Sequence, residues 1–240
     1  MKKKTKKKLI SSLCSVLLLL GIYFFQDQLI EIVEPSTKGS FVSYGMSSVP
    51  EQGKNLYKVL NNNQPTFTEE EKKLKSFESY SELDSLGRCG TAFALVSKQT
   101  MPKEERGKIG MIKPSGWHTV KYSFVDGKYL YNRCHLIAYQ LTGENANEKN
   151  LITCTRTMNT KGMLPFENEV SKYVKETKNH VLYRVKPIFK DENLLASGVE
   201  MEAYSIEDGG KGISFHVYIY NKEPKVWIDY RTGESKEDNE

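Results

Sequence analysis

The sequence predicts an α+β protein with a mixed or antiparallel sheet and an N-terminal transmembrane helix. Three observations lead to this fold class. Short strand-like segments separated by Gly-containing turns run through residues 90–220, one amphipathic helix interrupts them, and a long apolar run precedes them. With 240 residues, of which 38% are hydrophobic, the chain has the length for one folded domain and an appendage.

The N-terminus has the pattern of a membrane anchor. Six lysines lie among the first eight residues, and residues 9–25 follow without a charge. The positive-inside rule keeps the lysines in the cytoplasm and places the C-terminal body outside. Because residues 22–28 contain no clear cleavage site, we expect an uncleaved single-pass anchor in the cell membrane. A cleaved signal that releases a secreted body is the alternative.

The N-terminal lysines also account for the net charge of +5, because no acid before Asp27 offsets them. Six lysines exceed that total by one, so the rest of the chain has a net charge of −1. The bulk charge of the body therefore does not indicate a nucleic-acid binder. Any affinity for phosphate has to come from a local basic cluster or from a metal.

The composition divides the chain into four parts. Residues 1–25 are the lysine-rich start with the anchor or signal, 26–80 a spacer, 81–233 the folded domain, and 234–240 an acidic tail that we expect to fray. Within the spacer, Thr66 or Thr68 is placed to cap a short helix over 69–76.

The first half of the domain alternates strands and turns. Alternating apolar residues predict a strand over 90–96. Strand-like patterns follow over 119–124 and 128–135, and the hairpin signal Asp126-Gly127 joins them. A polar loop over 143–149 leads into a short strand over 151–155.

The second half begins with a helix that Pro165 opens and that runs to about Lys178. Its apolar residues, among them Phe166, Val170 and Val174, recur at helical spacing. Strands over 181–189, 194–204 and 213–220 follow as an antiparallel meander, with a turn at residues 208–210.

Residues 131–137, Tyr-Asn-Arg-Cys-His-Leu-Ile, are the most informative part of the sequence. Arg133 precedes His135 by two residues, and Asn159 and Glu167 follow near the start of the predicted helix. They supply a general base, a cation for phosphate, an oxygen ligand for a hard metal and a supporting carboxylate. These are the groups that phosphodiester hydrolysis needs.

The strand, loop, strand and helix between Lys128 and Lys178 resemble a ββα-metal (His-Me finger) nuclease site. Residues 131–137, 147–153 and 159–167 resemble the DNA/RNA non-specific endonuclease family, in the branch of membrane-linked DNA-entry nucleases and secreted streptodornase-type DNases. The resemblance covers about residues 85–232. The family's signature Asp-Arg-Gly-His appears here as Asn-Arg-Cys-His at residues 132–135, so two of its four positions differ.

The resemblance implies a Mg²⁺-dependent endonuclease that cuts DNA, with RNA as a second candidate substrate and Mn²⁺ as a substitute metal. His135 matches the general base, and Asn159 matches the protein ligand to Mg²⁺. Glu167 matches the acid that supports the metal site through water, and Arg133 matches the arginine beside the phosphate. The chemistry agrees, because neutral imidazole accepts a proton near neutral pH and Mg²⁺ prefers oxygen ligands. No set of residues for reading base edges is evident, so cutting is expected to be indifferent to sequence.

Each of these residues also has a purely structural interpretation. A histidine near a strand end is more often structural, Asn159 is a helix-cap candidate, and Glu167 complements a helix dipole. The occurrence of all of them in the right order favours the catalytic interpretation. Candidate phosphate contacts are Arg156, Lys161 and Gln140, whereas His118, His180 and His216 have no such companions.

The body contains Cys89, Cys134 and Cys154, so an exported body leaves at least one thiol unpaired. We expect a Cys89–Cys134 bridge, because both residues flank strands that could be neighbours. The body has no CxxC motif and no matched pair of histidines, which argues against a zinc site.

Two other classes of function are open at this stage. A surface protein that captures DNA without cutting it would need neither a metal nor His135. A hydrolase that uses Cys134 and His135 as a nucleophile pair is disfavoured, because adjacent residues on a strand point to opposite faces. Cleavage of DNA with and without a chelator separates the three classes. The sequence does not indicate an oligomeric state.

Overall fold

The computed structural model describes residue 50 and residues 55–239. The predicted anchor over residues 9–25 lies outside the described residues. Within the described part of the chain, no helix is long and apolar enough to cross a membrane.

Six antiparallel strands form the main sheet in the order β1-β8-β7-β6-β3-β2, and two small sheets pair β4 with β5 and β9 with β10. In the described residues the strands are β1 (Tyr57–Val59), β2 (Glu78–Tyr80), β3 (Ala92–Val96), β4 (Tyr131–His135), β5 (Leu151–Thr155), β6 (Val181–Ile188), β7 (Gly198–Ser205), β8 (Ser214–Tyr220), β9 (Val226–Ile228) and β10 (Ser235–Glu237). The helical elements there are the 3₁₀ turns η1 (Asn61–Asn63), η2 (Glu71–Lys73) and η3 (Glu148–Asn150), the helices α2 (Tyr139–Thr142) and α3 (Leu164–Thr177), and the π-helix η4 (Met158–Met163).

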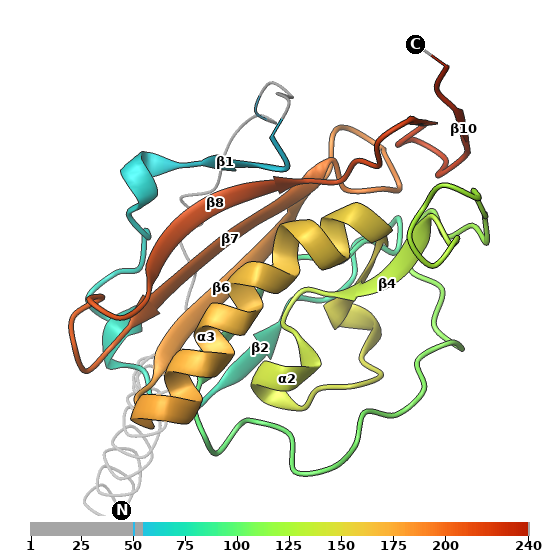
Figure 1. Cartoon of the computed structure of the whole chain (residues 1–240). Coiled ribbons are helices and arrows are strands. Elements are labelled where there is room, and N and C mark those ends of the chain that lie inside the picture. Colours follow the sequence, from blue (N-terminus) through green and yellow to red (C-terminus); the bar gives the residue numbers. More distant parts are fainter. Residues whose placement is uncertain (1–49, 51–54, 240) are drawn as a thin grey trace, which may run out of the picture. The chain divides into compact units, whose positions relative to one another are not determined.

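Helix α3 lies across one face of the main sheet, and β4 and α2 are on the same side (Figure 1). Successive residues of a strand point to opposite faces, so every second residue of β7 faces the helix. Met201 and Ala203 of β7 accordingly join Val170 and Val174 of α3 in the main hydrophobic core. The predicted α+β class and the antiparallel meander β6-β7-β8 are confirmed.

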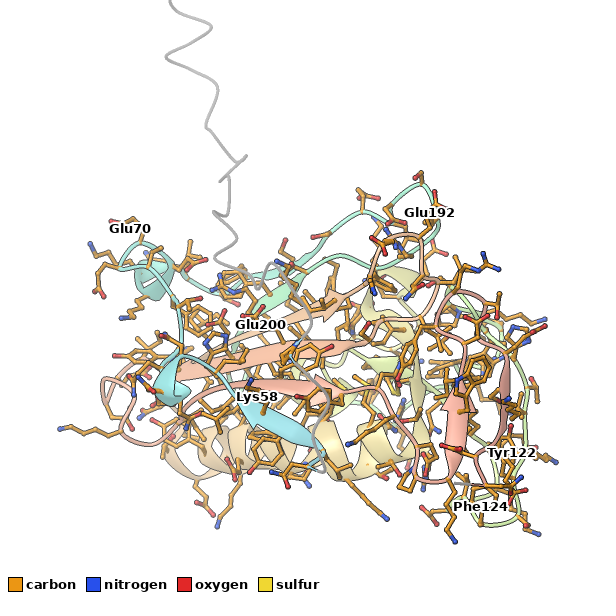
Figure 2. The ribbon with its side chains drawn as sticks, turned by 90° about the horizontal axis from the view of Figure 1, so that it is seen from above. Lys58, Glu70, Tyr122, Phe124, Glu192 and Glu200 are labelled. Atoms are coloured by element: carbon orange, nitrogen blue, oxygen red, sulfur yellow. A yellow bond between two sulfur atoms is a disulfide. The ribbon has the colours of Figure 1, made fainter. Side chains whose placement is uncertain are left out.

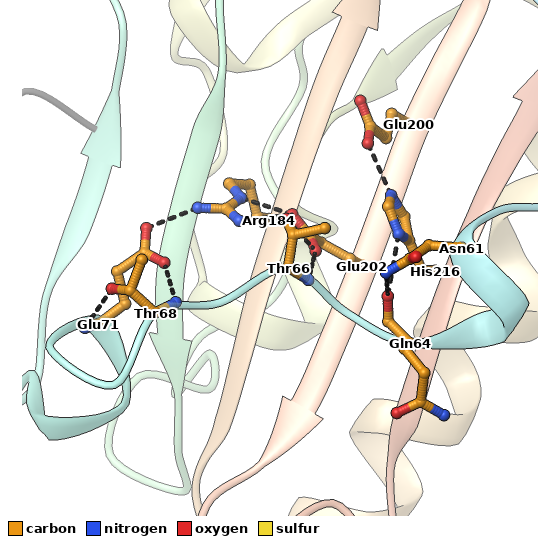
Figure 3. Close-up of polar contacts among 9 residues, drawn as sticks. All are labelled: Asn61, Gln64, Thr66, Thr68, Glu71, Arg184, Glu200, Glu202 and His216. Carbon is orange, nitrogen blue, oxygen red and sulfur yellow. Dashed lines mark hydrogen bonds and ion pairs between the residues drawn. The ribbon is translucent and has the colours of Figure 1, made fainter. Parts of the chain in front are cut away.

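The opposite face of the sheet holds a buried polar network (Figure 3). Arg184 of β6 lies 2.6 Å from both Glu71 and Glu202. His216 of β8 lies 2.6 Å from Glu200. Burial alone would lower the pKa of His216, but the hydrogen bond to Glu200 and the nearby acids raise it above its usual value. Because its charge is paired and buried in this way, His216 is a structural residue.

The segment before β2 covers this network. Thr66 donates its backbone N–H to Glu202 at 2.6 Å. Thr68 and Glu71 cap each other, since the Thr68 hydroxyl accepts from the Glu71 N–H and the Glu71 carboxylate accepts from the Thr68 N–H. The cap at Thr68 is therefore confirmed, but it opens only the short turn η2 and not a helix over 69–76.

Three segments differ from the sequence-based prediction. The described part of the predicted spacer 26–80 contributes β1 and β2 to the two edges of the main sheet. Residues 119–124 form no strand and make one isolated bridge, Lys121 with Tyr129. The tail over 234–240 is partly ordered by pairing, because β10 hydrogen-bonds to β9.

The predicted Cys89–Cys134 bridge is wrong, because Cys134 is bonded to Cys154. The strands β4 and β5 pair with Cys134 opposite Ile152 and Cys154 opposite Asn132. The two cysteines are thus diagonal neighbours whose Cα atoms lie 5.9 Å apart, a separation typical of a disulfide. The buried thiol of Cys89 instead donates to the carbonyl oxygens of Glu148 and Leu151, each at 3.2 Å.

Candidate active site

His135 lies at the end of β4 and is only 6% exposed. Its Nε2 lies 2.7 Å from the carbonyl oxygen of Asn145. A carbonyl can only accept, so Nε2 carries the proton and Nδ1 is the basic nitrogen of the neutral ring. Burial is the main cause that lowers the pKa of His135, to about 4, so the ring is neutral at pH 7.

The positive charge of Arg106 acts on both His135 and Glu167. Its Nη2 lies 3.1 Å from His135 Nδ1. Burial raises the pKa of Glu167, at the start of α3, to about 8, and the positive charge of Arg106 partly opposes that shift. Within the described residues, no hydrogen bond to the Glu167 carboxyl group is present. A buried carboxyl group without such a partner is suited to take up a cation or ordered water.

Asn159 lies in the π-helix η4 and lines a groove together with Arg106. Its Nδ2 donates to the side-chain oxygen of Asn132 at 3.4 Å. That contact identifies the nitrogen end of the Asn159 amide, so the Oδ1 end is left for a cation. Asn132 is thus in a position to orient Asn159, and it stands where the family signature has an aspartate.

The π-helix η4 affects the relation of Asn159 to Glu167, which follows it by eight residues. In a regular α-helix each residue turns the chain by about 100°, so residues seven apart share a face and residues eight apart do not. The wider turn of η4 takes up about one residue, and Glu167 therefore returns toward the face of Asn159. The apolar spacing after Pro165 predicts the helix but not this wider turn before it.

Arg133 lies on the same face of β4 as His135, two residues away. Its guanidinium donates to the backbone oxygens of Ile112 and Gly110, and its centre is 3.9 Å from the ring centroid of Trp117. In this arrangement Arg133 fastens the long β3–β4 loop to β4. It also lines the same groove as Asn159, where part of it is within reach of a bound phosphate.

The groove has a volume of about 550 Å³ and runs past cationic, amide and aromatic side chains. Its lining includes Arg106, Trp117, Tyr129, Arg133, Arg156 and Asn159. Of the predicted phosphate contacts, Arg156 lines this groove and forms an ion pair with Asp126 at 3.0 Å. Lys161 lies in the adjoining hollow. Gln140 is on α2 and donates to Asn168 Oδ1 at 3.0 Å, so it is not part of either lining.

Comparison with known proteins identifies the family of this chain. A family profile described as DNA/RNA non-specific endonuclease matches residues 50–207, which is more than half of the chain. The chain belongs to the DNA/RNA non-specific endonuclease family. The resemblance that residues 131–137 and 159–167 predicted is thereby confirmed, and the protein is a nuclease that acts on nucleic acid.

Solved nuclease structures share the fold. NucA from Streptococcus agalactiae with a bound magnesium ion is 27% identical, with a TM-score of 0.66, over 75% of this chain and 87% of that one. NucA without metal is 28% identical, with a TM-score of 0.65, over 75% and 86% of the two chains. Sda1 nuclease with a bound zinc ion is 25% identical, with a TM-score of 0.62, over 75% and 95%. These relatives support a divalent metal in a nuclease of this fold.

Arg106 belongs to the candidate site, although the sequence pattern does not indicate it. It lies in an irregular loop, 29 residues before His135, among acids and other basic residues. Nothing in the local pattern distinguishes it from a solvated loop charge. Only the folded path of the β3–β4 loop brings it to His135, and a long loop of this kind in a compact domain is commonly functional.

Proposed function

We propose that this nuclease is a Mg²⁺-dependent endonuclease that hydrolyses DNA without regard to sequence and acts outside the cell. One observation carries the proposal. His135 donates a hydrogen bond from Nε2–H to the Asn145 carbonyl, which leaves Nδ1 as a general base beside a groove that Arg106 and Asn159 line.

In this mechanism Nδ1 of His135 takes a proton from the attacking water. The oxygen of that water bonds to phosphorus, the bond from phosphorus to the 3′ oxygen breaks, and a 5′-phosphate and a 3′-hydroxyl remain. The departing 3′ oxygen takes its proton from solvent. Arg106 covers Nδ1 in the free protein. Because a phosphate anion is a stronger acceptor than a neutral imidazole, substrate draws the guanidinium away and uncovers the base.

The donor groups fit Mg²⁺. Asn159 would hold it directly through Oδ1. Burial raises the pKa of Glu167 to about 8, so its carboxyl group is protonated at pH 7 in the free protein and would release that proton to support a bound ion through water. Both donors are oxygens, which Mg²⁺ prefers, and one protein ligand suffices because this ion keeps several waters. When bound, the ion would neutralise charge on the phosphate and lower the activation free energy for departure of the 3′ oxygen. Mn²⁺ should substitute, since it accepts the same ligands.

Substrate choice and location are parts of the same proposal. The groove presents phosphate contacts and stacking surfaces, so cleavage should depend little on base sequence and should weaken as salt rises. Such an enzyme would damage the chromosome of its own cell. The lysine-rich start and the apolar residues 9–25 would place the body outside, as a single-pass anchor or as a cleaved signal.

The test is cleavage of plasmid DNA by the full chain in mild detergent, with Mg²⁺ and with EDTA. We expect cleavage with Mg²⁺, none with EDTA, and recovery when Mg²⁺ is restored in excess. His135→Ala should lower the rate by about 10²–10⁴-fold, because a general base is lost. His118→Ala is the matched control, since His118 bonds the backbone oxygen of Thr232 and lies outside the site.

Partial recovery of the His135→Ala rate by added imidazole would support the role of a base. An alanine variant with more than about a tenth of the wild-type rate would contradict it. Binding of DNA without any cleavage would favour the other candidate, a surface protein that captures DNA.

A further inference from the structure

The catalytic groove continues into two further hollows. The middle hollow, about 500 Å³, shares Asp126 and Arg156 with the catalytic groove and adds Phe124 and Lys161. The outer hollow, about 530 Å³, shares Glu223, Pro224 and Lys225 with the middle one and ends at Trp227. Each is large enough for a nucleotide-sized group. Together they form one track from Asn159 to Trp227.

The charge of this track differs from that of the body as a whole. Six cations and three acids line the three hollows, whereas the chain after its N-terminal lysines has a net charge of −1. Two of the acids are already engaged. Asp126 pairs with Arg156, and Glu223 accepts the N–H and hydroxyl of Thr157 at 2.8 and 2.6 Å. Six cations against three acids leave an excess of three positive charges along the track.

Two exposed aromatic side chains, Trp227 and Phe124, line this track. In β9, Val226 and Ile228 point into a hydrophobic cluster with Leu130 and Leu195, so Trp227 points outward. Its side chain is 49% exposed, and the Lys236 ammonium lies 5.1 Å from the ring centroid. Phe124 is 40% exposed, and Figure 2 shows it beside Tyr122 at one end of the described body.

The outer hollow is fixed to the catalytic segment. Glu223 bonds Thr157, which is two residues before Asn159. The turn after Glu223 closes through a hydrogen bond from Val226 N–H to the Glu223 oxygen, and Lys225 and Trp227 both line the outer hollow. A strand that occupies the track would thus be held at a set distance from the scissile phosphate.

We infer that this track binds a single nucleic-acid strand that extends beyond the cleaved bond, with bases stacked on Trp227 and Phe124 and phosphates on Arg156, Lys161 and Lys225. Cations interleaved with exposed aromatic rings are the features that bind single strands without sequence preference. A duplex keeps its bases stacked inside and cannot use the rings in this way. The inference rests on the proposed nuclease function and adds a preferred substrate class, unpaired strands of more than a few nucleotides.

The test measures binding by the full chain in detergent, with His135→Ala and EDTA to prevent cleavage. The probes are fluorescein-labelled oligo(dT) of 4 and 20 nucleotides and a duplex of 20 base pairs. We expect Trp227→Ala to weaken binding of the 20-nucleotide strand about five-fold or more and to leave the 4-nucleotide strand and the duplex unchanged. Lys225→Glu should weaken the long strand and lower its salt dependence, whereas Lys190→Glu should not.

Lys190 is the matched charge control, because it is exposed and lines none of the three hollows. It precedes Glu192 by two residues, and Figure 2 shows Glu192 well apart from Phe124. In the active enzyme, Trp227→Ala should raise KM for the long strand and leave kcat unchanged. A folded Trp227→Ala protein that binds the long strand like its parent would overturn the inference, as would equal losses for all three probes. With either of these binding results, cleavage by the wild-type chain would still support the proposed nuclease function. Absence of cleavage by the wild-type chain would instead contradict the nuclease function.

Discussion

Asn159 and Asn132 form the smallest testable unit of the site. Asn159→Ala should lower activity severely and raise the Mg²⁺ concentration needed for half-maximal rate, because the direct oxygen ligand is lost. Asn132→Asp is the matched control, since it keeps an oxygen acceptor for the Asn159 amide and restores the family signature. The measurement is a Mg²⁺ titration of cleavage rate for each variant. A wild-type titration curve for Asn159→Ala would show that its amide is only structural and that the ligand lies elsewhere.

The sequence indicates some residues of the candidate site and not others. His135, Asn159 and Glu167 are candidates because their types and spacing occur together, and their catalytic roles stay predictions. Arg106 is not indicated, because its partner is 29 residues away and joined by an irregular loop. The contacts of Arg133 with Trp117 and the loop carbonyls could not be predicted either. They depend on the folded path of the loop before β4, which the spacing between Arg133 and His135 does not reveal.

The β4–β5 pair is the element that carries the site, and the Cys134–Cys154 bond connects its two strands. The bond closes a loop with a sequence separation of 20, for which chain entropy gives a stabilisation of about 3 kcal/mol. For a domain of this size that corresponds to about 6–12 °C in Tm. We therefore expect Cys134→Ser/Cys154→Ser to melt lower than wild type by that amount, and Cys89→Ser to serve as the control.

Thermal unfolding followed by circular dichroism, with and without reductant, measures this effect. Reductant should lower the Tm of the wild type toward that of the double variant and leave the double variant unchanged. Equal Tm values for wild type and double variant would show that the hydrogen-bonded pairing of β4 and β5 is sufficient without the bond.

Elements were predicted unevenly. Long segments such as β6, β8 and α3 were found within a few residues. The apolar residues of α3 recur at helical spacing, and β6 and β8 are runs of seven or eight residues rich in β-branched and aromatic side chains. The three-residue strands β1 and β2 were not found, because their order comes from pairing with distant strands and not from their own pattern. The predicted disulfide joined the wrong pair of cysteines, because the sequence pattern does not show which strands are neighbours. Cys134 lies on β4, whose partner is β5 with Cys154.

For the whole molecule, the location of the body is the property to test. Intact cells that produce the full chain are treated with an external protease. We expect loss of the body and protection of the lysine-rich stub, because the apolar residues 9–25 would leave the body outside. A cytoplasmic marker protein and lysed cells are the controls. A fully protected body in intact cells would place the catalytic domain inside, and recovery of an intact body in the medium would favour a cleaved signal.

The pairing of the edge strand β1 affects when the nuclease domain can fold during synthesis. Tyr57 pairs with Ile219, so the main sheet is complete only when two segments near opposite ends of the described chain have paired. Contacts of such long separation require the ordering of a large loop before they contribute, and they form late. A ribosome completes His135 well before it completes β8. During synthesis the proposed catalytic residues are therefore present for some time in a chain that cannot yet assemble its sheet, and the nuclease matures only after its last strands have emerged.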